Sequence, residues 1–127
     1  MTPERRANNV VWFELPVNNL TRAAEFYEQV FSTKLLTHES FPSIAMFPRK
    51  QDDAVTGALT LTDTGKPSTD GAVVYLNCDG QLDLVIKRAL AAGAQLLQEV
   101  VQLPAGIGWS AQLRDLDGNR VGLHASW

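Results

Sequence analysis

The strongest constraint on this chain is an order of predicted elements that occurs twice. The first half opens with a strand at about 10–17, where β-branched and aromatic residues dominate. Asn18 and Asn19 then offer helix N-cap oxygens, and the apolar residues that follow recur on one helix face: Leu20, Ala23, Tyr27 and Val30. Three more extended stretches are predicted at about 34–40, 43–48 and 56–63. The first half therefore has the order β-α-β-β-β.

The second half repeats that order. A strand at about 72–78 precedes a helical pattern that ends at Gly93 and is carried by Leu82, Val85, Ile86, Ala89 and Leu90. Strands follow at about 95–101, 108–115 and 119–126, the last two joined through Asp117 and Gly118, a strong hairpin signal. The two patterns superpose at an offset of roughly 61 residues, as an internal repeat would. We expect an α+β fold of two βαβββ modules, at about 9–63 and 72–126, in one domain of residues 1–127.

Composition narrows the classes of function. The 127 residues suffice for one domain, and a net charge of −3 with scattered Lys and Arg leaves no basic stripe for nucleic acid. No apolar run reaches the roughly 20 residues of a membrane span, and residues 1–9 lack the apolar core of a signal peptide. The single cysteine, Cys78, fits a reducing compartment. We therefore expect a cytoplasmic protein with neither a nucleic-acid nor a membrane partner.

Alternation along the predicted strands shows which side chains face away from the helices. In the first strand Trp12 and Glu14 share the face opposite to Phe13 and Leu15. The same rule, applied to the later strands, predicts the set that lines a concave sheet face: Trp12, Glu14, Thr60, Tyr75, Asn77, Gln112, Arg114 and His124. Aromatic surface with a few converging polar groups is typical of a small-molecule pocket, but a sheet that is merely wet on one face shows the same alternation.

Several of these segments resemble a known superfamily. The first similar segment is Val11-Trp12-Phe13-Glu14-Leu15-Pro16-Val17, and it is followed by Arg22-Ala23-Ala24 and Phe26-Tyr27. The second half agrees at Val73-Val74-Tyr75-Leu76, at Ile107-Gly108-Trp109 and from Asp115 to His124. These runs resemble the vicinal-oxygen-chelate superfamily of glyoxalase, bleomycin-resistance and dioxygenase-like proteins. They are most similar to the predicted enzymes related to lactoylglutathione lyase. The resemblance implies that the two modules form an open cup or barrel.

The resemblance also bears on cofactors. Metal enzymes of the superfamily carry His, Glu or Gln at four inward strand positions, which fall here at Trp12, about Ala58, Val73 and Gly122. None of these side chains can coordinate a divalent metal. We therefore expect no metal and no other cofactor, and we do not expect a lactoylglutathione lyase or extradiol dioxygenase reaction.

Two ionisable residues lie next to the positions that hold metal in relatives. Glu14 and His124 each follow such a position by two residues, so both are expected to enter the same cavity. A carboxylate beside an imidazole can fix its tautomer and provide a general acid or base. Glu14 could equally bind a cationic ligand group, or pair with Arg114 or Arg120. Catalysis, ligand binding and a structural hydrogen bond are all open at this point.

Three functions fit these observations. The first is a metal-independent lyase or isomerase that uses Glu14 and His124 for proton transfer. The second is a non-catalytic protein of bleomycin-resistance type that sequesters a small molecule or antibiotic. The third is an accessory domain with a vestigial cup. The expected ligand-binding residues are Trp12, Thr60, Tyr75, Asn77, Trp109, Gln112 and Arg114. The resemblance further implies a homodimer.

Overall fold

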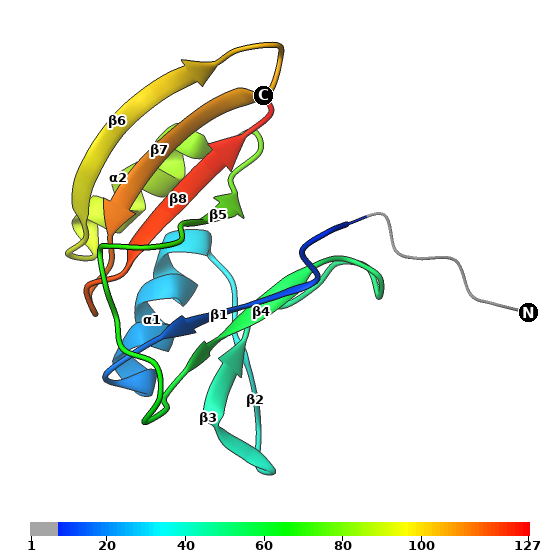
Figure 1. Ribbon diagram of the computed structural model, residues 1–127, viewed down its shortest axis with the longest axis vertical. Coiled ribbons are helices and arrows are strands. Elements are labelled where there is room, and N and C mark those ends of the chain that lie inside the picture. Colours follow the sequence, from blue (N-terminus) through cyan, green and yellow to red (C-terminus); the bar gives the residue numbers. More distant parts are fainter. Residues whose placement is uncertain (1–7) are drawn as a thin grey trace, which may run out of the picture.

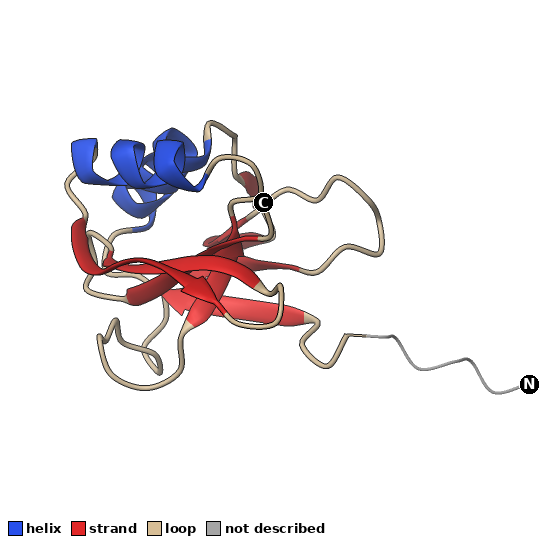
Figure 2. Ribbon diagram, turned by 90° about the horizontal axis from the view of Figure 1, so that it is seen from above, coloured by secondary structure: helices blue, strands red, loops and turns tan. Residues whose placement is uncertain are grey.

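The computed structural model describes residues 8–127 and shows two four-stranded sheets with both helices on one side of the strands (Figures 1 and 2). The first module consists of β1 (Trp12–Pro16), α1 (Leu20–Phe31), β2 (Leu36–His38), β3 (Phe41–Met46) and β4 (Thr56–Thr60). The second consists of β5 (Val74–Asn77), α2 (Leu82–Ala91), β6 (Gln95–Leu103), β7 (Gly108–Arg114) and β8 (Arg120–Ala125). The predicted βαβββ order is confirmed in both halves. Residues 1–7, which the one-domain prediction includes, lie outside the described residues.

Strand pairing stays within each module. The strand orders are β1-β4-β3-β2 and β5-β8-β7-β6, with β1 parallel to β4 and β5 parallel to β8. Neither sheet closes into a barrel, so the described strands form the open version of the expected cup. The modules meet through their helices, because α1 packs against α2. No helix within residues 8–127 is long and apolar enough to cross a membrane.

Local sequence explains where α1 begins and ends. The Asn19 side chain accepts a hydrogen bond from the Arg22 backbone N–H at 3.0 Å, which confirms the predicted N-cap. Ser32 ends the helix in the left-handed region, with φ at 51°. Of the predicted apolar face, Ala23, Tyr27 and Val30 are buried and Leu20 is half-buried. Phe26 is buried as well, although the prediction did not include it.

The core lies between the helices and the sheets. On β8 the side chains of Val121, Leu123 and Ala125 expose 2% or less of their surface. The intervening residues of β8 face the other way, as strand alternation requires. The predicted division of β8 into an apolar face and a functional face is therefore confirmed on its apolar side. On β1, Leu15 faces the core in the same way.

A buried carboxylate connects the two modules. Asp115, at the end of β7, accepts backbone N–H groups of Asp117, Gly118 and Asn119 on Oδ1, at 3.0, 3.0 and 2.9 Å. Its Oδ2 accepts the Tyr27 hydroxyl of α1 at 2.7 Å and Asn119 Nδ2 at 3.1 Å. Asp115 exposes 2% of its surface and Tyr27 exposes 1%. Burial of this charge is tolerated because five hydrogen bonds replace its hydration.

The same turn holds the junction between β1 and α1. Asp117 Oδ1 accepts the Asn18 backbone N–H at 2.8 Å and the Arg22 guanidinium at 3.3 Å. Asn119 Nδ2 donates to the Pro16 carbonyl at 2.7 Å. The sequence predicts this turn as a hairpin, and the structure adds that it is also the polar link between the modules.

Replacing Tyr27 by Phe tests this link. Burial and the neighbouring Asp115 carboxylate raise the pKa of Tyr27 well above its usual range. Loss of the hydroxyl should lower the free energy of unfolding by about 1–3 kcal/mol, because a buried acceptor loses a donor. In the unfolded chain Tyr27 loses its proton near pH 10, whereas in the folded chain it keeps the proton to higher pH. The contribution of Tyr27 to the free energy of unfolding is therefore complete below about pH 10 and declines above it. Urea unfolding at several pH values measures both effects.

Tyr75→Phe is the matched control, since Tyr75 is the other tyrosine of the chain and is 47% exposed. It should leave the free energy of unfolding within about 0.5 kcal/mol of the wild type. Equal losses in the two variants, or a Tyr27→Phe deficit that grows above pH 10, would contradict the role assigned to the buried pair.

Candidate functional site

A hollow lies on the face of the second sheet that points away from α2. Its volume is about 240 Å³, and the residues lining it are Tyr75, Leu76, Asn77, Asp79, His124 and Ser126. The strands β5 and β8 pair Tyr75 with Gly122 and Asn77 with His124. The side chains of Tyr75, Asn77 and His124 therefore share one sheet face, and the structure brings these three predicted site residues together.

The ring of His124 has a fixed tautomer. Its Nε2 lies 2.7 Å from the backbone carbonyl oxygen of Ile107, in the loop between β6 and β7. A carbonyl oxygen only accepts hydrogen bonds, so Nε2 carries the hydrogen. In the neutral ring Nδ1 is then unprotonated and can accept a hydrogen or a proton. A backbone carbonyl, rather than the Glu14 carboxylate considered from the sequence, orients this imidazole.

A chain of hydrogen bonds ends at Tyr75. Gln112 Nε2 donates to the Tyr75 hydroxyl oxygen at 2.7 Å, and Arg120 Nη1 donates to Gln112 Oε1 at 2.9 Å. Arg120 Nε in turn donates to the carbonyl of Thr69, in the segment between the modules, at 3.0 Å. Tyr75 and Gln112 are predicted site residues. Arg120 is not among the predicted site residues, although alternation places it on the same face of the last strand as His124. Thr69 carries no signal because it contributes a backbone oxygen.

The Tyr75 ring covers Gly122. A Cβ atom at position 122 would overlap three carbon atoms of that ring. The ring therefore occupies the direction in which a metal-binding side chain at this position would extend. Trp12, Ala58 and Val73 likewise supply no metal ligand. The residues at the four superfamily ligand positions thus do not fit a metal, and within residues 8–127 no three His, Cys, Asp or Glu side chains form a cluster that could hold one.

The predicted residues of the first module form a separate group. Trp12 Nε1 donates to Glu14 Oε2 at 3.1 Å, and both side chains are exposed on β1. Thr60 exposes only 7% of its surface. No hydrogen bond or ion pair within residues 8–127 joins Glu14 to His124.

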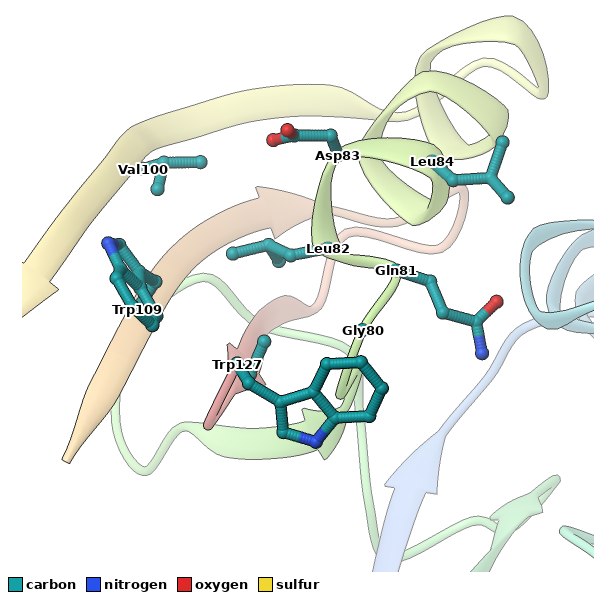
Figure 3. A pocket seen from close by; sticks show the side chains of 9 residues that line it. Gly80, Gln81, Leu82, Asp83, Leu84, Val100, Trp109 and Trp127 are labelled. Carbon is teal, nitrogen blue, oxygen red and sulfur yellow. The ribbon is translucent and has the colours of Figure 1, made fainter. Parts of the chain in front are cut away.

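Of the seven predicted ligand-binding residues only Tyr75 and Asn77 line the hollow, and Trp109 and Arg114 of β7 are among those that do not. Trp109 is on the helix-facing side of β7 because it precedes the buried Ala111 by two residues. It lines a groove of about 830 Å³ with Leu82, Val100 and other residues, and Figure 3 shows the Leu82 side chain extending from the start of α2 toward it. Arg114 is exposed, and its Nη2 would lie 3.3 Å from a Cβ placed at Gly118.

Polar residues around the hollow restrict its chemistry further. Asp79, which sequence reasoning did not select, accepts the Ser126 backbone N–H on Oδ1 at 2.6 Å. Strand alternation could have identified Asp79, because it follows Asn77 by two residues. Burial raises the pKa of the Cys78 thiol to about 12, so this cysteine stays protonated near neutral pH and is no nucleophile. His38 is exposed and accepts the Ser40 backbone N–H, as a local turn would.

Comparisons with known proteins identify the family and the fold. Residues 9–123 match the model of the Glyoxalase/Bleomycin resistance protein/Dioxygenase superfamily. Among solved structures, the chain is similar to a glyoxalase/bleomycin resistance protein from Albidiferax ferrireducens T118, with a TM-score of 0.76, 18% identity and coverage of 93% of this chain and 98% of that one. The chain is also similar to a glyoxalase-related enzyme from Fulvimarina pelagi, with a TM-score of 0.68, 20% identity and coverage of 92% of this chain and 87% of that one.

A third similar structure is a lactoylglutathione lyase from Agrobacterium tumefaciens, with a TM-score of 0.62, 15% identity and coverage of 94% and 96%. Among curated proteins none matches this chain. At these identities the similar structures establish the fold alone, and the predicted two-module cup is confirmed.

Gly122→Ala tests whether the Tyr75 ring is held as described. The added methyl group must displace the ring, which should cost about 1–3 kcal/mol of folding free energy and break the bond from Gln112. NMR spectra should show the Gln112 side-chain amide signals moving to solvent-like positions. Gly65→Ala is the control, because a Cβ there meets its neighbours at ordinary contact distances of 3.4 and 3.5 Å. Unchanged Gln112 signals in Gly122→Ala would show that the ring is not packed on this glycine.

Proposed function

Since the chain belongs to the Glyoxalase/Bleomycin resistance protein/Dioxygenase superfamily, we propose that it binds a small organic molecule in the hollow of its second module and transfers a proton there without a metal. The observation that carries this proposal is the tautomer of His124. Because Nε2 is bonded to the Ile107 carbonyl, Nδ1 is the ring nitrogen left to accept a proton. Tyr75 and Asn77, which line the same hollow, are the proposed ligand contacts.

The proposed step needs only this chain and a ligand with an acidic hydrogen. His124 Nδ1 takes the proton, and the electron pair of the broken bond stays on the ligand. The resulting imidazolium keeps its Nε2–H bond to the Ile107 carbonyl, which stabilises the positive charge. Return of the proton at a neighbouring atom gives an isomer, whereas departure of a leaving group gives a lyase product.

Glu14 is the proposed second proton-transfer group, and a homodimer would provide a way to place it. The strands β1 and β5 are terminal in their sheets, so each has one edge without a strand partner among the described residues. Val10, Val11 and Trp12 near that edge expose 64%, 44% and 42% of their surface. We propose that two copies pair so that the first module of one adjoins the second module of the other, in the cytoplasm, where the lone Cys78 stays reduced.

Sequestration of a ligand without chemistry is the second candidate. Trp12 and Tyr75 expose 42% and 47% of their surface on the strand faces assigned to the cup. Exposed rings of this kind can stack on a flat ligand. An enzyme and a sequestering protein differ at one point, because only the enzyme requires an ionisable group at position 124.

Thermal unfolding in the presence of metabolites, antibiotics and divalent metals tests the proposed function. A ligand at 100 times its Kd should raise the melting temperature on the order of 10 °C. His124→Gln keeps a polar side chain but removes the base, so it should abolish turnover of any substrate while a merely sequestered ligand still binds. Glu14→Gln tests the second group in the same way. Stabilisation by Zn²⁺, Ni²⁺ or Mn²⁺ that both variants lose would contradict the metal-free site.

Sedimentation velocity tests the dimer. We expect a dimer at micromolar concentration, and Trp12→Lys should shift the protein toward a monomer because it places a charge at the proposed contact. Leu84→Lys is the control, since Leu84 is comparably exposed but lies on α2. A stable wild-type monomer would contradict the proposal.

A further inference from the structure

The chemistry of Arg120 fixes the direction of every hydrogen bond that leads to Tyr75. A guanidinium only donates, so the end of the Gln112 side chain that meets Arg120 at 2.9 Å must be its oxygen. The Gln112 NH₂ group therefore faces Tyr75 and donates to the hydroxyl oxygen at 2.7 Å. The Tyr75 hydroxyl oxygen therefore accepts a hydrogen bond from Gln112. The hydroxyl hydrogen takes no part in this series of hydrogen bonds.

That hydrogen has no acceptor within residues 8–127. Among the described residues the Tyr75 hydroxyl has one hydrogen bond, which it accepts from Gln112, and Tyr75 is 47% exposed along the hollow that contains His124. We propose that the Tyr75 hydroxyl is a hydrogen-bond donor reserved for the ligand, and that the ligand group it binds is an acceptor oxygen of a carbonyl or carboxylate. This inference rests on the proposed function, because it names the class of molecule for the same hollow.

The charges around the hollow place this acceptor at its Tyr75 end. Arg120, which lies behind Gln112, puts a positive charge on this side and polarises the chain toward Tyr75. The negative charge of Asp79 lies among the other lining residues, where its carboxylate accepts the Ser126 backbone N–H. A ligand oxygen at Tyr75 and an acidic hydrogen directed to His124 Nδ1 would satisfy both free groups at once.

The segment between the modules positions this donor from a distance. Arg120 Nε is bonded to the Thr69 carbonyl, and the Arg120 backbone N–H donates to the Ser68 carbonyl at 3.1 Å. Gln112 and Arg120 are therefore positioning residues for Tyr75. Their role predicts an unusual effect of Gln112→Glu. A carboxylate accepts from both Arg120 and Tyr75, so this variant should turn the hydroxyl hydrogen inward and leave only the oxygen lone pairs for a ligand.

Three probes of similar shape distinguish a donor from an acceptor at Tyr75. Acetophenone offers only an acceptor, benzoate offers an anionic acceptor, and benzylammonium offers only donors. NMR titration of the wild type with each probe, following the Tyr75 ring and Gln112 amide signals, gives the affinities. We expect acetophenone and benzoate to shift the Tyr75 ring and Gln112 amide signals at millimolar concentration. Benzylammonium, which the Asp79 carboxylate could attract elsewhere in the hollow, should leave these signals unchanged.

The variants supply the decisive comparison. Tyr75→Phe removes one oxygen and should weaken acetophenone about tenfold and benzoate between about tenfold and a hundredfold. Gln112→Glu should weaken uncharged acetophenone to the same degree and allow benzylammonium to shift the Tyr75 ring signals. Arg120→Met removes the donor to Gln112 Oε1 and should weaken acetophenone binding. Arg120→Lys can still donate to this oxygen and should keep most of the wild-type affinity for acetophenone. Thermal unfolding of each variant confirms that it is folded.

Three results would overturn the inference. These are equal acetophenone affinity in Tyr75→Phe and the wild type, shifts of the wild-type Tyr75 and Gln112 signals by benzylammonium that exceed those by acetophenone, and failure of every acceptor probe to shift the Tyr75 signals. Failure of the proposed function looks different. If a ligand is turned over through His124 but binds equally well without the Tyr75 hydroxyl, the proposed function holds and this inference fails. If the acceptor probes need Tyr75 but no ligand is turned over through His124, this inference holds and the proposed function fails.

Discussion

The hydrogen bond between Tyr27 and Asp115 is the contact on which the relation between the two modules depends. A carboxylate that exposes only 2% of its surface would be very costly without partners, yet five donors surround it. Three of these donors are backbone groups of its own turn, so these bonds hold the shape of the turn from within. The Tyr27 hydroxyl then selects one position for that turn against the first module.

The position of the turn determines where the site lies. β8 begins directly after it and pairs with β5 in parallel and with β7 in antiparallel orientation. One face of β8 is buried in the core, and the other carries Arg120, Gly122 and His124 in succession. Arg120 anchors the series of hydrogen bonds that leads to Tyr75, and Gly122 makes room for the Tyr75 ring. His124 supplies the ring nitrogen that can accept a proton. A single strand therefore organises the hollow, and its register depends on the hairpin that Asp115 stabilises.

The sequence predicted the repeat, the ten elements and the two faces of β1, β5 and β8, because periodicity and turn residues act locally. It did not predict that β4 is buried on both faces, which leaves Thr60 inside. It also predicted the group of Tyr75, Asn77 and His124, which alternation alone places on one face. It did not predict that Ile107 orients His124, since a backbone carbonyl leaves no mark on residue type. The relation of Glu14 to His124 depends on how two modules, or two chains, pack together, and no local pattern encodes that. The sequence prediction includes Trp109 among the ligand contacts, but alternation along β7 places it on the same face as the buried Ala111.

The state of the His124 ring tests the central claim most directly. Long-range ¹H–¹⁵N correlation spectra of protein labelled in its two histidines report which ring nitrogen carries the hydrogen, and His124→Gln identifies the signals that belong to His124 rather than His38. The geometry at Ile107 predicts a protonated Nε2 and an unprotonated Nδ1 in the neutral ring. A neutral ring with its hydrogen on Nδ1 would contradict the account, because Nδ1 could then not accept a proton from a ligand.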